Sequence, residues 1–108
     1  MANVRRGEVD AVIDGRRRIL VLTLGALAEM EAAFGAADLG ALAERFGSGR
    51  LSARDACTVI AAGLSGAGER VSGEEVAAMQ IEGGAVGAVQ LVNALLAATF
   101  GGKAAPRP

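Results

Sequence analysis

The chain has 108 residues, a length that fits a single domain with one modest hydrophobic core. Its net charge of −1 gives no electrostatic basis for binding nucleic acid, and its one cysteine, Cys57, excludes an intramolecular disulfide. With no histidine and no second cysteine, a structural zinc site is in practice excluded as well. The apolar residues are largely alanine, leucine and valine, and this composition favours closely packed helices over a β-sandwich.

Residues 7–22 are predicted to form a β-hairpin. Apolar and polar residues alternate along "GEVDAVIDG", and a second run rich in Ile, Leu and Val follows. Between the two runs stands Asp14-Gly15, a dipeptide that suits a two-residue turn because both positions need a positive φ. Two strands alone are only marginally stable, so the hairpin must pack on helices or pair with another chain.

Five short helices are expected after the hairpin. Residues with capping hydroxyls, Thr23, Ser52 and Ser72, mark the starts of three of them. Glu75 completes a capping box with Ser72, and Asp55 stands at the same distance from Ser52. The third helix is apolar around most of its circumference, so we expect it at the centre of the fold. The helices are expected over residues 23–35, 38–47, 52–65, 72–83 and 85–100.

These elements predict an α+β fold that is mostly α, an N-terminal β-hairpin followed by about five short helices. One small globular domain is expected over residues 1–100, with the hairpin at 7–22 and the helical body at 23–100. Residues 101–108, "GGKAAPRP", have no means of burying apolar surface and are expected to be a disordered tail. The first ten residues lack the apolar run of a secretory signal, so a cytoplasmic location is expected.

Residues 83–102 carry no charge and are long enough to raise the alternative of a transmembrane helix. Gln90 and Asn93 would each need a hydrogen-bonding partner in lipid, and several glycines interrupt the stretch. A buried helix of a soluble domain is therefore the favoured interpretation, and no membrane partner is expected.

The sequence offers little support for catalysis. It has no histidine or tyrosine, and Cys57 has no candidate base beside it. Glu74 and Glu75 would point about 100° apart on a helix, so they do not form an acid–base pair. The glycine-rich stretch "GLSGAGER" lacks the phosphate-loop pattern and follows a helix rather than a strand. We therefore expect no enzyme activity and no catalytic, cofactor-binding or metal-binding residue.

The fifth predicted helix has two apolar sides. Val89, Val92 and Leu96 share one side, while Leu91 and Leu95 stand on the other. Two apolar sides on a terminal helix indicate two contacts, of which one is the domain's own core. The second could be a partner protein or a second copy of the chain, or the hairpin and third helix could cover both sides. Leu91 and Leu95 are accordingly candidate partner-interface residues.

The arginines of the hairpin, Arg16, Arg17 and Arg18, are the other candidate interface residues. Without interleaved aromatic residues they give little indication of nucleic-acid binding. These arginines could lie at a solvated strand edge, contact an acidic protein partner or pair with an acidic residue of the same chain. The three alternatives remain open. Glu31 lies at the edge of the first helix's apolar stripe, and we expect it to pair with one of these three arginines or with Arg45 or Arg54.

Four segments resemble a known family of small tail proteins, encoded in the gene transfer agent clusters of alphaproteobacteria and in siphophage-like prophages. They are "RGEVDAVIDGRRRILVLTLGALAEMEAAFG", "LAERFGSGRLSARDACTVIAAGL", "VSGEEVAAM" and "ALLAATFGG", which together span residues 6–101. The resemblance implies a role in a phage-like tail. The family carries the label of tail tube protein and is also placed among tail assembly chaperones, which coat the tape measure protein before the tube forms. It supplies no catalytic or ligand-binding residues to carry over.

The sequence favours the chaperone role of these two. A tube subunit normally supplies many strands, whereas this chain offers two, and its helices supply apolar faces for a helical partner. We therefore expect a tail assembly chaperone that binds the tape measure protein or another tail protein in the cytoplasm, with a homo-oligomer also compatible. The alternative is a structural, tube-associated tail component retained in a virion-like particle. A small DNA-binding module is a third hypothesis, which the acidic helical body disfavours.

Overall fold

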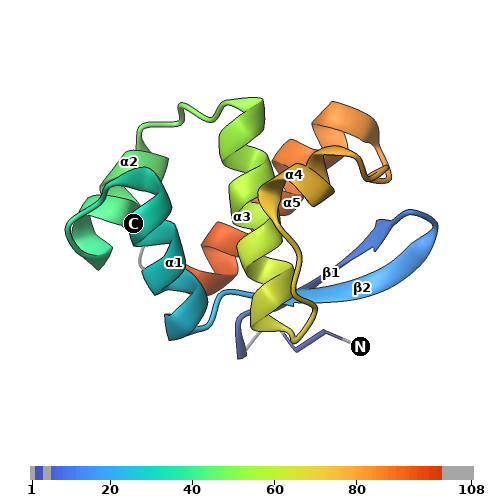
Figure 1. The fold of residues 1–108 in the computed structure, drawn as a ribbon, viewed down its shortest axis with the longest axis horizontal. Helices are drawn as coiled ribbons and strands as arrows, with labels where there is room; N and C mark the ends of the chain where they lie inside the picture. The colour runs from blue at the N-terminus through green and yellow to red at the C-terminus, as the bar shows by residue number, and fades with distance from the viewer. Residues whose placement is uncertain (1, 4–5, 101–108) are drawn as a thin grey trace, which may run out of the picture.

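A computed structural model describes residues 2–3 and 6–100 of the chain. Within these residues the fold is an antiparallel hairpin followed by five helices, as the sequence predicts (Figure 1). The predicted disordered tail, residues 101–108, lies outside the described residues. The elements are β1 (Glu8–Ile13), β2 (Arg16–Val21), α1 (Leu24–Phe34), α2 (Leu39–Gly47), α3 (Ala53–Gly66), α4 (Gly73–Ala77) and α5 (Gly84–Phe100).

The hairpin turns at the predicted dipeptide. Asp14 and Gly15 have φ values of 53° and 78°, and Ile13 pairs with Arg16 across the turn. Both residues thus occupy the left-handed region that a tight hairpin turn requires, which glycine adopts freely and aspartate tolerates. The register places Val9 opposite Leu20, and Leu20 is fully buried against the helices.

The prediction that the fourth helix continues to Gly83 is wrong. Helix α4 ends at Ala77, and residues 80–82, here called the edge segment, lie along the outer edge of β1, where Ile81 forms an antiparallel bridge with Ile13. The backbone nitrogen of Asp14 donates to the Gln80 carbonyl at 2.8 Å, and that of Glu82 donates to the Val12 carbonyl at 3.0 Å. In this position the backbone groups of residues 80–82 form hydrogen bonds with β1. They would not form these bonds if α4 continued to Gly83.

Side-chain caps begin the first four helices. Thr23 accepts from the Ala26 nitrogen in α1, and Ser72 forms the predicted capping box with Glu75 in α4. The structure completes a second box in α3, because Asp55 Oδ2 also accepts from the Ser52 nitrogen at 3.2 Å. These bonds satisfy backbone donors that the first turn of a helix leaves free, so the helix starts are fixed locally.

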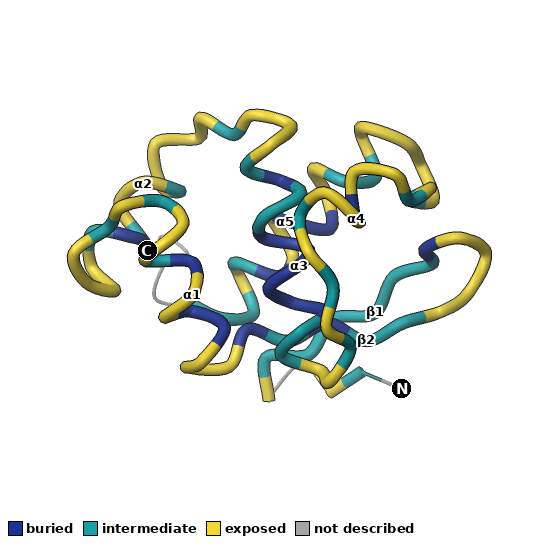
Figure 2. The backbone as a smooth tube through the Cα atoms, viewed as in Figure 1, coloured by how far each residue is buried: buried dark blue, intermediate teal, exposed yellow. Residues whose placement is uncertain are grey.

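Helix α3 is the centre of the fold, as its wide apolar arc predicts. It packs against β2, α1, α4 and α5, and its middle is buried (Figure 2). Two glycines permit close approaches: a side chain at Gly63 would touch Leu20 and Leu95, and one at Gly66 would meet the Val21 carbonyl oxygen at 1.9 Å. The core therefore joins the hairpin to the helices through α3.

The first two helices meet at their aromatic rings. Phe34 and Phe46 are in edge-to-face contact with ring centroids 5.2 Å apart, and the Arg45 guanidinium lies 4.8 Å from the centroid of Phe34. Arg45 also pairs with Asp55 at 3.3 Å. These contacts tie α2 to both α1 and the start of α3.

Helix α5 packs against α3 and both strands. Among the described residues, none of the helices has both the length and the apolar character needed to cross a bilayer.

Candidate interaction surface

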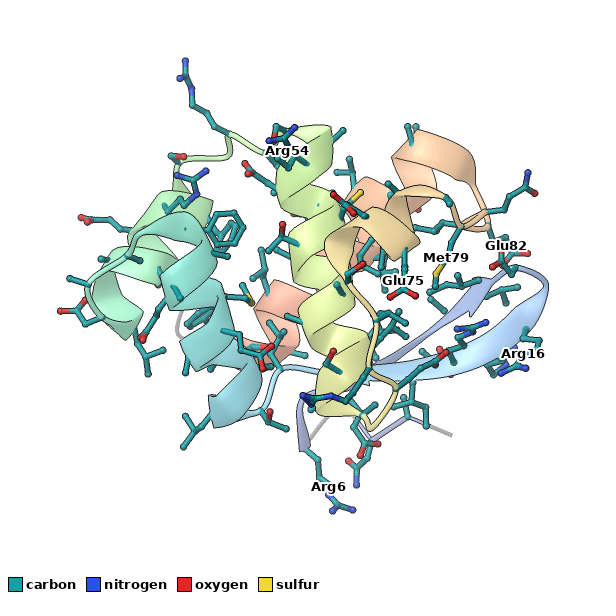
Figure 3. All side chains as sticks on the ribbon, in the orientation of Figure 1. Arg6, Arg16, Arg54, Glu75, Met79 and Glu82 are labelled. Atoms are coloured by element: carbon teal, nitrogen blue, oxygen red, sulfur yellow. The ribbon has the colours of Figure 1, made fainter. Side chains whose placement is uncertain are left out.

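The three hairpin arginines do not form one surface. Arg16 is exposed near the tip of the hairpin (Figure 3). The Arg17 side chain, 68% exposed, pairs with Asp10 on the neighbouring strand at 3.2 Å. Arg18 is largely buried and pairs with Glu69, which follows α3. Since strand residues alternate between faces, Arg18 shares the core-facing side with Leu20. Two of the three arginines thus have acidic partners within the chain.

Leu91 and Leu95 are core residues, which corrects their assignment to a partner interface. They are 6% and 0% exposed, and Leu95 packs against α3 at Gly63. The physical reason is that α3 and the hairpin together cover this side of α5. The large apolar side chains that α5 exposes are Val86 and Val89, at 66% and 45%.

The predicted pairing of Glu31 is also wrong for the described residues. Glu31 is half-buried, and no arginine of the described chain forms an ion pair with it. Arg45 instead meets Asp55 and the Phe34 ring. Figure 3 shows Arg16 by the hairpin and Arg54 by the start of α3, so the closeness of "GRRR" to Glu31 in the sequence did not lead to an ion pair.

An apolar groove of about 730 Å³ lies between α3, α4 and the first half of α5. We call it the α3–α5 groove. It continues past Met79 to the edge segment, and Leu51 stands at the other end. Its apolar walls include Ala56, Cys57, Ile60, Val76, Ala88 and Val89.

The lining of this groove suits apolar contact rather than chemistry. None of the residues that line it is charged. The Ser52 hydroxyl accepts from the Asp55 nitrogen at 3.0 Å and is thus engaged as a helix cap. Cys57 is half-buried, and no basic residue lines the groove beside it. Metal binding finds no support in residues 2–3 and 6–100 either, where no group of three or more acidic or cysteine side chains is placed to hold an ion.

Sequence reasoning expected a second apolar contact for α5 and assigned it to Leu91 and Leu95, whereas the apolar residues that α5 exposes are Val86 and Val89. The useful signal was the charge-free run from Gly84 to Val89, which joins Val86 and Val89 to small residues at the start of the helix. Small residues leave a groove open, and the valines beside it remain exposed.

The fold is small and mostly helical, and the α3–α5 groove on it is apolar and has no charged residue in its lining. A comparison with known families matches residues 6–102 to the family described as "Phage tail tube protein, GTA-gp10". The chain therefore belongs to this family of phage and gene transfer agent tail proteins. Neither the search of curated proteins nor the search of solved structures found a match.

Proposed function

We propose that the protein is a structural component of the tail of a gene-transfer-agent particle, without enzymatic activity. The observation that carries this proposal is the family match, which spans nearly the whole chain and describes a tail tube protein. In this proposal the protein works by binding neighbouring tail subunits, and the α3–α5 groove is one of its contact surfaces. Covering exposed apolar side chains such as Val86 and Val89 would stabilise that contact.

A second candidate function is that of a tail assembly chaperone that binds the tape measure protein. The fold favours it, because tube subunits normally contribute many strands and this chain has one hairpin plus a short edge segment. An apolar groove between helices is also a suitable binding surface for an amphipathic helix.

Quantitative mass spectrometry of purified particles separates the two candidates. We expect the protein in purified particles at a fixed, stoichiometric ratio to the major tail protein, since a structural subunit stays in the tail. A strain that lacks the gene serves as the control for carry-over and should yield particles without functional tails. Absence from particles whose tails nevertheless depend on the gene would overturn the structural proposal and support the chaperone.

Co-expression with the tape measure protein gives an independent measurement. A chaperone raises the soluble fraction of the tape measure protein and co-purifies with it, whereas the structural proposal predicts no such rise. The variant Val89→Asp, which places a charge in the groove, is the matched test of whether any co-purification uses this surface.

A further inference from the structure

We infer that the outer edge of β2, at Arg17 and Ile19, binds an acidic extended segment of another protein as an added strand. In strand addition, hydrogen bonds join the backbones of the two chains, and side chains beside the edge select the partner. This contact is separate from the α3–α5 groove and does not depend on the proposed tail role. Its support lies in the direction of the backbone groups, the placement of charges and the mismatch with a second copy of the chain.

The backbone groups of Arg17 and Ile19 point away from β1. Val12 and Arg17 are opposite each other in the hairpin, and the Val12 carbonyl accepts from the Glu82 nitrogen on the far side of β1. Opposed residues of an antiparallel pair direct their N–H and C=O groups either toward each other or away from each other, so those of Arg17 face the outer edge of β2. Ile19 stands two positions on and has the same direction. Among the described residues, none forms a hydrogen bond with these groups.

The free part of this edge is short. At one end, the Val21 carbonyl oxygen lies close to α3, since a β-carbon at Gly66 would come within 1.9 Å of it. At the other end, the strand runs into the turn of the hairpin. The free stretch therefore centres on Arg17 and Ile19, and an added strand bonds to both residues.

Charges of opposite sign lie at the two edges of the hairpin. Strand β2 begins with three arginines, whereas β1 carries Glu8 and Asp10, and Glu82 follows along the outer edge of β1. Figure 3 shows Arg16 and Glu82 on opposite sides of the hairpin. Arg16 is exposed, and the Arg17 side chain, 68% exposed, uses Nη1 to bond Asp10 at 3.2 Å. The other guanidinium donors of these two arginines are available to carboxylates on an added strand.

Strand β2 of a second copy is a poor partner for this edge. An antiparallel two-fold pairing that uses both Arg17 and Ile19 is centred at Arg18, so Arg18 meets its own counterpart. Each copy also brings Arg16 and Arg17 to the same short ladder. Like charges opposite each other destabilise a strand pair, so this edge does not match itself.

Strand β1 of a second copy is acidic, but its own outer edge is largely occupied. The edge segment bonds there at Val12 and Asp14. Near the start of the strand, the Glu8 nitrogen donates to the Asn3 carbonyl at 3.0 Å. A second copy therefore cannot supply β1 without breaking bonds around Asp10 on both sides. The partner that fits is an extended, acidic segment of another protein.

A synthetic peptide with the sequence of residues 7–15, GEVDAVIDG, blocked at both ends, is the probe. Its acidic and apolar residues already match β2 within the hairpin. We titrate it into the isotope-labelled full chain and follow the backbone amides by NMR. The Arg17 and Ile19 amides should shift and exchange more slowly with solvent, whereas those of Arg18 and Leu20, which face β1, should change little. A peptide with lysine at each acidic position is the control and should not bind.

The variant Ile19→Pro tests the backbone bonds. Proline removes the N–H group that points outward, and an edge strand tolerates proline where that group does not serve the sheet. We expect binding of the acidic peptide to weaken about fivefold, as for the loss of one hydrogen bond. The matched control is Ile19→Ala, which shortens the side chain, keeps the N–H group and should retain most of the binding. Circular dichroism checks that both variants are folded.

A charge exchange tests the partner's chemistry and does not depend on Ile19→Pro being folded. Replacing Arg16 and Arg17 together by glutamate should weaken binding of the acidic peptide at least about fivefold, since two ion pairs are lost. The same double variant should bind the lysine peptide instead. The matched control is Arg54→Glu, because Arg54 is exposed on α3 rather than on the hairpin, and it should leave the binding of both peptides unchanged.

Several results would overturn the inference. One is an acidic peptide that does not bind, or that binds without changing the Arg17 and Ile19 amides. Another is equal binding of the acidic and lysine peptides, which would exclude an acidic partner. Slower exchange at the two amides when the chain alone is concentrated would assign the edge to a second copy. Each of these results leaves the proposed tail role standing, because mass spectrometry of particles tests that role separately.

Discussion

At Gly66 the central helix α3 lies close against the end of the hairpin. A β-carbon there would lie 1.9 Å from the Val21 carbonyl oxygen and 3.4 Å from the Thr23 nitrogen, and neither backbone atom can move aside easily. We expect Gly66→Ala to lower the free energy of unfolding by about 2–3 kcal/mol, because the helix must shift away from β2. Urea unfolding followed by circular dichroism measures the change.

The control for this substitution is Gly47→Ala. Gly47 is also helical, but a β-carbon there meets nothing within 4 Å. Alanine should leave the stability unchanged or raise it by up to about 1 kcal/mol, since it has the higher helix propensity. Equal losses at both positions would contradict the close approach at Gly66.

Asp14 holds both the turn of the hairpin and the edge segment. Its φ is 53°, and its Oδ1 accepts from the Gln80 nitrogen at 2.8 Å. We expect Asp14→Ala to cost about 1–2 kcal/mol, because it loses this bond and tolerates the left-handed backbone less well. Asp14→Asn keeps the acceptor and the backbone preference, so it should retain most of the stability. Thermal unfolding of the two variants side by side is the measurement.

At the scale of the elements, the short helix α4 depends on its cap. It has five residues, and Ser72 and Glu75 satisfy its first backbone donors reciprocally. We expect Ser72→Ala to cost about 1 kcal/mol and to speed amide hydrogen exchange at Glu75 and Val76. The control is Thr58→Ala in α3, where the hydroxyl donates only to the carbonyl of its own helix at Arg54. That variant should leave exchange in α4 unchanged.

The elements that local chemistry determines were predicted from the sequence. The turn at Asp14 and the starts of α1, α3 and α4 each depend on residues a few positions apart. The edge segment could not be predicted in this way. Its bonds join Asp14 to Gln80, which are 66 positions apart, and "MQIE" carries no turn or cap signal of its own. A contact of that separation is decided by packing rather than by local preference.

The candidate interaction surface was also predictable only in part, because its local pattern is visible in the sequence and its packing is not. The sequence indicated that α5 has more apolar surface than one contact needs, but it assigned Leu91 and Leu95 to the partner. Which side of an apolar helix remains exposed depends on what packs against it, here α3 and the hairpin. The pairing of Arg18 with Glu69, 51 positions away, was likewise beyond a periodicity argument.

At the scale of the whole molecule, Leu95 joins α5 to the central helix and the hairpin. It is fully buried and lies against Gly63 of α3. We expect Leu95→Ala to lower the free energy of unfolding by about 2–5 kcal/mol, from lost apolar burial and the cavity it leaves. Chemical denaturation measures this. Val86→Ala, at an exposed position of the same helix, should change stability by no more than about 0.5 kcal/mol.

The edge segment has a consequence for how copies of this protein can join. An incoming strand could not occupy the outer edge of β1 at Val12–Asp14 without displacing residues 80–82 and breaking the hydrogen bonds of Val12, Asp14 and Gln80. Open strand edges otherwise act as templates for uncontrolled polymerisation. In the folded protein, residues 80–82 thus already occupy part of this strand edge. Growth by strand addition at this edge must first break bonds, whereas association through the helices leaves the sheet intact.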